Sequence, residues 1–102
     1  MGRQDTAARH ENLLHELNEE RAAALLRISR TLEGLIAQLQ TQRERIVVAA
    51  AAERDVERER YRELHAQAVK YRWYLEVQRE ALGLRHHHRI DEFYAIPPSE
   101  AP

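Results

Sequence analysis

Apolar residues recur at steps of three and four positions along two long segments of the chain. One run lies between residues 14 and 46, and the other between residues 61 and 82. Because this spacing places apolar side chains on one face of an α-helix, each run predicts a long helix with a seam for a partner helix. We expect the following residues to form this oligomer seam: Leu14, Leu17, Ile28, Leu32, Leu35, Leu39, Ile46, Leu64, Tyr71, Leu75 and Leu82.

Between the two runs the apolar pattern is lost and charged residues take over. Val56 is the only apolar residue between positions 53 and 60. One interpretation is a turn near residues 52–58, which would let the two seams face each other as an elongated antiparallel helical hairpin, or coiled coil. The alternative is one continuous helix from about residue 6 to residue 82, since Ala, Glu and Arg are strong helix formers. We favour the all-α hairpin, because a charged segment suits a solvent-exposed tip.

Glycine and proline mark the ends of the helical region. Gly34 is the only one of either type between positions 3 and 82, and the seam continues through it. Gly83 predicts a helix end in the left-handed conformation, and Pro97 with Pro98 predicts an extended tail. The expected organisation is a disordered or capping segment at residues 1–5, a coiled-coil region at 6–84, and a short helix with an extended tail at 85–102.

The helix predicted at residues 64–84 carries apolar side chains on two opposite faces. Besides the seam, a second stripe lies about 180° around the helix axis. It must pack either against the C-terminal segment of the same chain or against a second protein. Two corresponding roles are open for the apolar C-terminal segment: it docks on a partner, or it closes the end of the bundle. Since large aromatics beside arginine dominate binding hot spots, the candidate partner-binding residues are Val69, Trp73, Val77, Ile90, Phe93, Tyr94 and Ile96.

Residues 46–52 form a run of consecutive apolar residues. On a helix such a run coats every side, which predicts burial all round and argues for self-association or a partner. The expected partners are therefore other proteins and a second copy of this chain.

Composition excludes several classes of function. The 102 residues include no cysteine, and the formal net charge of −1 offers no basic field for nucleic acid. No stretch of about 20 apolar residues is present for membrane insertion, and the first residues lack the apolar core of a signal peptide. We therefore expect a cytoplasmic protein. The abundance of Arg and Ala indicates a GC-rich, bacterial genome.

One basic stripe, formed by Arg54, Arg58 and Arg62, is interleaved with carboxylates. Side chains three positions apart on a helix can neutralise each other. We expect such pairs between Asp55 and Arg58 and between Glu59 and Arg62, which leaves no surface for phosphate.

Candidate chemistry is sparse. Three consecutive histidines, His86, His87 and His88, are weak candidates for a metal site. Neighbouring helical side chains point about 100° apart, and arginines flank the group. The two serines, Ser29 and Ser99, lie in no context that would activate a nucleophile. We expect no enzyme activity and no cofactor.

These features predict a non-enzymatic helical interaction protein, a self-associating scaffold, adaptor or structural subunit of a larger assembly. One alternative is a small helical cytoplasmic chaperone that binds an apolar cargo segment, for which the face around Trp73 would be empty until cargo fills it. A second is a helical protein that binds metal through its histidine cluster.

Overall fold

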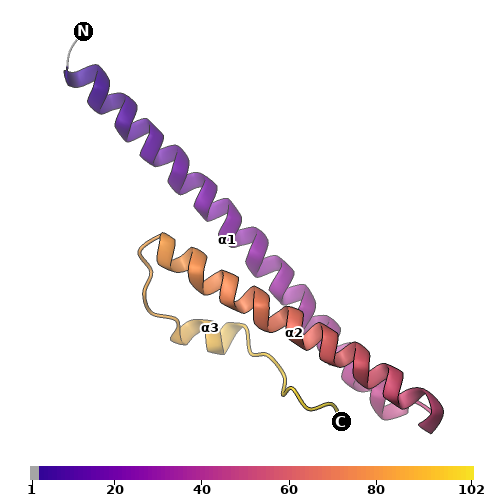
Figure 1. Ribbon diagram of the computed structural model, residues 1–102. Helices are drawn as coiled ribbons and strands as arrows, with labels where there is room; N and C mark the ends of the chain where they lie inside the picture. The colour runs from indigo at the N-terminus through magenta and orange to yellow at the C-terminus, as the bar shows by residue number, and fades with distance from the viewer. Residues whose placement is uncertain (1–2) are drawn as a thin grey trace.

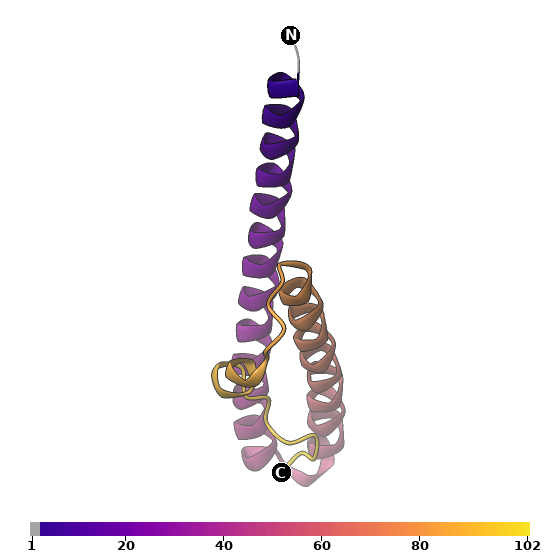
Figure 2. The same cartoon turned by 90° about the vertical axis from the view of Figure 1, so that its left-hand side faces the viewer.

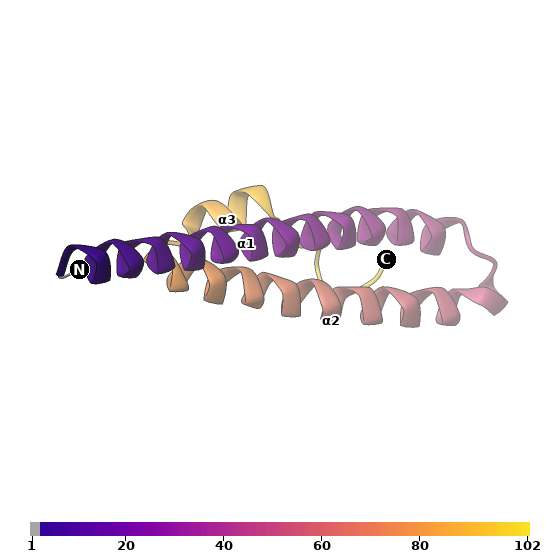
Figure 3. The same ribbon diagram turned by 90° about the horizontal axis from the view of Figure 1, so that it is seen from above.

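The chain folds into two long antiparallel helices followed by a short third helix (Figure 1). The computed structural model describes residues 3–102, with the side chains of Arg3, Gln4 and His88 excepted. Helix α1 spans Arg3–Val48, α2 spans Ala51–Ala81 and α3 spans His88–Phe93, and these described residues contain no strand. The predicted all-α hairpin is confirmed, and the continuous-helix alternative is wrong. Figure 3 shows α1 and α2 side by side, joined at the end far from the N-terminus.

The chain reverses direction at Ala49 and Ala50, slightly before the segment 52–58 in which we expected the turn. Ala50 is extended, with φ −65° and ψ 152°, and Arg54 Nη2 donates to the carbonyl of Ala49 at 3.1 Å. The expected tip instead forms the first turns of α2. Its charged side chains stabilise a helix there, because Arg58 lies 3.8 Å from a carboxylate oxygen of Asp55.

The earlier turn also changes the surroundings of residues 46–52. The expected burial on all sides is not found within the single chain, because α1 ends inside this run and leaves Val47 and Val48 exposed. Ile46 is buried. It lies at a small pocket that Arg54, Arg58 and Pro102 also line.

The hydrophobic core is the line along which the two seams meet. Burying a large aliphatic side chain contributes roughly 1.5–3 kcal/mol, so this line supplies most of the force that closes the hairpin. It consists of four residues of α1, four of α2 and one of α3: Leu32, Leu35, Leu39, Ile46, Tyr61, Leu64, Ala68, Leu75 and Ile90.

Helix α1 continues well past the end of α2. Arg21 Nη1 donates to the carbonyl of Ala81 at 3.4 Å, which marks where α2 ends beside α1. Residues 3–20, which we call the overhang, run on alone (Figures 1 and 2), and the side chains of residues 5–20 are all exposed.

The first helix begins at Arg3, earlier than the start predicted at residue 6. Asp5, which we expected to precede the helix, lies in its first turn. A carboxylate in that position stabilises the positive end of the helix dipole, which explains the earlier start. Residues 1 and 2 of the predicted N-terminal segment lie outside the described residues.

Helix α2 ends at a left-handed glycine, as predicted. Gly83 has φ 85°, and the N–H of Leu84 donates back to the carbonyl of Arg79 at 2.9 Å. Residues 85–102, which we call the C-terminal strap, then cross one face of the hairpin, first as a linker with α3 and then as an extended tail (Figure 2).

Candidate interaction surfaces

The predicted seam residues fall into two groups. Those in the hairpin are buried or half-buried and serve the core of the single chain. Leu14 and Leu17 lie in the overhang, where their exposed fractions are 47% and 38%. Most of the seam is therefore used within the chain, and its role in oligomers stays a prediction. The buried or half-buried members are Ile28, Leu32, Leu35, Leu39, Ile46, Leu64, Tyr71, Leu75 and Leu82.

A second apolar surface lies on the outer side of α2, about opposite the buried seam. It consists of Val69, Trp73 and Val77, and we call it the Trp73 face. All three side chains are exposed, and Trp73 retains 59% of its surface. The ring centroid of the indole lies 5.6 Å from that of Tyr74 on the same helix. The sequence left two neighbours possible for this face, the C-terminal segment of the same chain and a second protein. The C-terminal segment does not cover it.

The C-terminal strap packs on the hairpin of its own chain. Ile90 is buried in the core, and Tyr94 and Ile96 are partly buried against it. Phe93 is largely exposed, with an exposed fraction of 74%. Three of the four C-terminal candidates are therefore occupied within the chain, and only Phe93 offers a large free surface to a partner.

Two side chains of α2 hold the proline-containing part of the strap. The hydroxyl of Tyr61 donates to the carbonyl of Pro98 at 2.5 Å, and Nε2 of His65 lies 3.0 Å from the carbonyl of Pro97. Arg43 of α1 in turn donates to the Tyr61 oxygen at 3.2 Å. Because proline has no N–H, these carbonyls are the groups through which this part of the strap hydrogen-bonds.

Arginines fasten the strap at several further points. Arg72 forms an ion pair with Asp91 of α3. Other guanidinium groups donate to backbone carbonyls: that of Arg79 to His86 at 3.0 Å, that of Arg58 to Pro102 at 3.3 Å, and that of Arg43 to Glu100 at 3.5 Å. Sequence reasoning missed this role of arginine. The periodicity of a helix gives no information about the path of an irregular segment packed on it.

The charged stretch of α2 neutralises itself, as expected. Arg58 lies close to Asp55, and Nε of Arg62 lies 3.2 Å from a carboxylate oxygen of Glu59. All four side chains are well exposed to solvent. Such exposed pairs contribute little to stability, and the expected absence of nucleic-acid binding stays a prediction.

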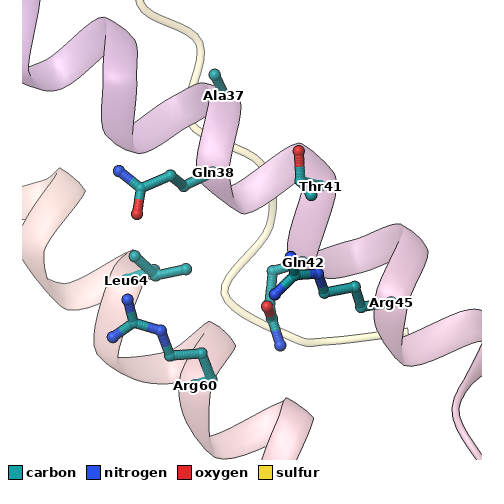
Figure 4. Close-up of a pocket in the computed structure, with 7 residues that line it drawn as sticks. All are labelled: Ala37, Gln38, Thr41, Gln42, Arg45, Arg60 and Leu64. Carbon is teal, nitrogen blue, oxygen red and sulfur yellow. The ribbon is translucent and has the colours of Figure 1, made fainter.

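An open pocket of about 300 Å³ lies between α1 and α2, with the strap behind the two helices in the view of Figure 4. Arg60 lies 3.6 Å from a carboxylate oxygen of Glu63, so its charge is partly compensated. Among the described residues, those that line the pocket include no carboxylate or histidine, the groups that most often act as general acids and bases. The lining residues are Ala37, Gln38, Thr41, Gln42, Arg45, Arg60 and Leu64.

The candidate metal residues lie in and beside the linker between α2 and α3. Nε2 of His87 is 3.1 Å from a carboxylate oxygen of Glu80. Among the described side chains, no group of three His, Cys, Asp or Glu residues is placed to hold a metal ion. The side chain of His88 lies outside that set, and metal binding by the histidine cluster stays a prediction.

None of the helices described for residues 3–102 combines the length and apolarity needed to cross a bilayer. The expected cytoplasmic location is a separate prediction that this finding does not test.

Comparison of the chain with protein families, with curated proteins and with solved structures finds no significant match.

Proposed function

We propose that this chain is a non-enzymatic helical interaction protein, a self-associating scaffold, adaptor or structural subunit that binds other proteins through exposed apolar surfaces. The observation that carries this proposal is the Trp73 face. A tryptophan flanked by two valines lies in solvent on a helix whose opposite side is already buried in the hairpin.

Exposure of this face is not forced by the fold. The hairpin closes through the seam, and the strap packs on a different side of α2 through Tyr61, His65 and Arg72. Burying a tryptophan and two valines from water would contribute several kcal/mol to association, at about 25 cal/mol per Å² of apolar area. Tryptophan is also among the residue types that dominate interface energetics.

Replacement of Trp73 by alanine tests the proposal. We expect Trp73→Ala to abolish or strongly weaken capture of a partner from cell extract, while far-UV circular dichroism shows helicity unchanged, because the indole contributes nothing to the hairpin core. Val56→Ala is the matched control, since Val56 is an exposed apolar residue of α2 outside this face. An assembly state and a set of captured proteins that are the same for wild type and both variants would overturn the proposal.

A chaperone role is the second candidate, and the same exposed face favours it. Trp73 is the only tryptophan in the chain, so its fluorescence reports occupancy of the face directly. An apolar cargo segment that fills the face should shift the emission to shorter wavelength. A chaperone would also suppress aggregation of the cargo and release it on folding, whereas an adaptor would keep its partner in a stoichiometric complex.

A further inference from the structure

We propose that the overhang is a dimerisation element that pairs antiparallel with the overhang of a second copy of this chain. This inference deepens the proposed function, on whose self-association it rests. The product is an end-to-end rod in which each α1 is paired with its own α2 along one half and with the other copy along the other half.

The overhang continues a seam that the hairpin already uses. From Arg21 toward the N-terminus, the same face of α1 carries Leu17, Leu14, His10 and Ala7, again at steps of four and three. Beside α2 this face is buried, whereas on the overhang it is exposed. A helix placed in line with α2, beyond its end, would extend the existing interface in the same direction.

The length of the overhang sets the register of the pair. Because α2 ends beside Arg21, a second overhang of equal length fits the vacant place when the two overlap completely in antiparallel orientation. In that overlap residue 17 lies level with residue 6 of the other copy, and residue 14 with residue 9. The seam residues Ala7 and His10 lie one position further along, so each leucine of the seam faces a smaller or partly polar seam residue of the other copy. The arrangement is self-complementary, as a two-fold interface requires.

Charge selects the antiparallel orientation. Residues 11–20 hold four glutamates and no arginine or lysine, whereas residues 3–10 hold two arginines and one aspartate. Within the acidic half, Nε2 of His15 lies 2.9 Å from a carboxylate oxygen of Glu19. A parallel pair would place the acidic halves side by side, while an antiparallel pair sets each beside the basic half of the other copy. Charge of this kind selects orientation more than it adds affinity.

The overhang has little to stabilise it alone. At about 1.5 Å per residue it is roughly 27 Å long, and isolated helices near this length are marginal in water. Two asparagines, Asn12 and Asn18, lower its helix propensity further. Three leucines of the overhang, Leu13, Leu14 and Leu17, are exposed, and pairing with a second copy removes them from water.

The first test is the mass in solution of the full chain, measured by light scattering during size-exclusion chromatography. We expect twice the chain mass of 12.0 kDa for the wild type, and the single chain mass for the double variant Leu14→Glu/Leu17→Glu, with an unchanged denaturation midpoint at low concentration. Leu26→Glu is the matched control, because Leu26 is an equally exposed leucine of α1 beyond the overhang. It should remain dimeric.

The second test fixes the orientation. The chain has no cysteine, so Thr31→Cys carries a single spin label per copy on the exposed side of α1. Complete antiparallel overlap predicts about 55 Å between the two labels, and a parallel pair predicts less than about 25 Å. The dimer should also scatter X-rays as a rod of roughly 120 Å, compared with the 75 Å length of one chain.

Several outcomes would overturn the overhang dimer. They are a monomeric wild type at sub-millimolar concentration, a double variant that stays dimeric, a short label distance, or loss of the dimer in Trp73→Ala. The last result would place self-association on the Trp73 face. A monomer that still captures a partner through Trp73 would sink this inference and leave that part of the proposed function standing.

Discussion

The two halves of α1 share one helix and one seam, yet their environments are opposite. Between residues 25 and 48 the seam is buried against α2, with Leu32 and Leu39 fully covered. Between residues 3 and 20 the same face is exposed to water. Large apolar residues continue on this face in both halves, so periodicity identifies which side of a helix is suited to a partner and leaves open what covers it. Within the monomer, the lengths of the two helices decide how much of this face is covered, because α2 is shorter than α1.

The largest expected contrast comes from one substitution made in each half. Leu39→Ala should lower the free energy of unfolding by about 2–5 kcal/mol, because it leaves a cavity in the core. Leu14→Ala should change it by less than about 0.5 kcal/mol when the chain is dilute enough to be monomeric. Urea denaturation followed by circular dichroism measures both values.

Equal losses in the two variants at low concentration would contradict the comparison, since they would mean that the overhang folds as part of the core. An effect of Leu14→Ala that grows with protein concentration would instead report the overhang dimer, because dissociation then precedes unfolding.

The sequence predicted the elements that depend on repeated local signals. The seams, the end of α2 at Gly83 and the pairing of Arg58 with Asp55 all follow from spacing along one helix. The turn was placed too late because the seam of α2 begins only at Tyr61, whereas the helix itself begins at Ala51. The first turns of α2 carry mainly charged residues, so no apolar spacing marks them as part of the helix.

The course of the strap could not be predicted, for a different reason. Its attachment depends on single hydrogen bonds from side chains far away in sequence, such as Tyr61 to Pro98. No periodic pattern encodes them. The exposure of the Trp73 face could not be predicted for the same reason, because it depends on the course of the strap. The sequence predicted a second neighbour for this face, and the strap of the same chain leaves Val69, Trp73 and Val77 exposed.

A change of intermediate size in the free energy of unfolding is expected from the strap, which packs on the hairpin and not on the overhang. Tyr61→Phe removes the hydroxyl that donates to Pro98 and accepts from Arg43, and should cost about 1–2 kcal/mol. We expect hydrogen exchange to accelerate in the strap and in the adjoining turns of the hairpin, and to stay unchanged in the overhang.

Tyr71→Phe is the matched control for the strap, because the Tyr71 hydroxyl makes no hydrogen bond with the described part of the chain. It should leave exchange in the strap as in the wild type. Faster exchange in both variants would show that loss of any tyrosine hydroxyl loosens this surface, and would remove the special role assigned to Tyr61.

The smallest effect separates intrinsic helix propensity from cooperative stability. Gly34 lies in the paired half of α1, and a methyl group added there meets no atom within 4 Å. Gly34→Ala should therefore raise the free energy of unfolding by up to about 1 kcal/mol, since the helix at this point forms and melts with the core. Asn18→Ala improves propensity by a comparable amount in the overhang, where formation of the helix is not linked to the core. It should increase helicity and slow hydrogen exchange locally, while the denaturation midpoint of the monomer stays constant. If both substitutions raise the midpoint equally, α1 is one cooperative unit from end to end, and the two halves differ in their contacts without differing in their folding.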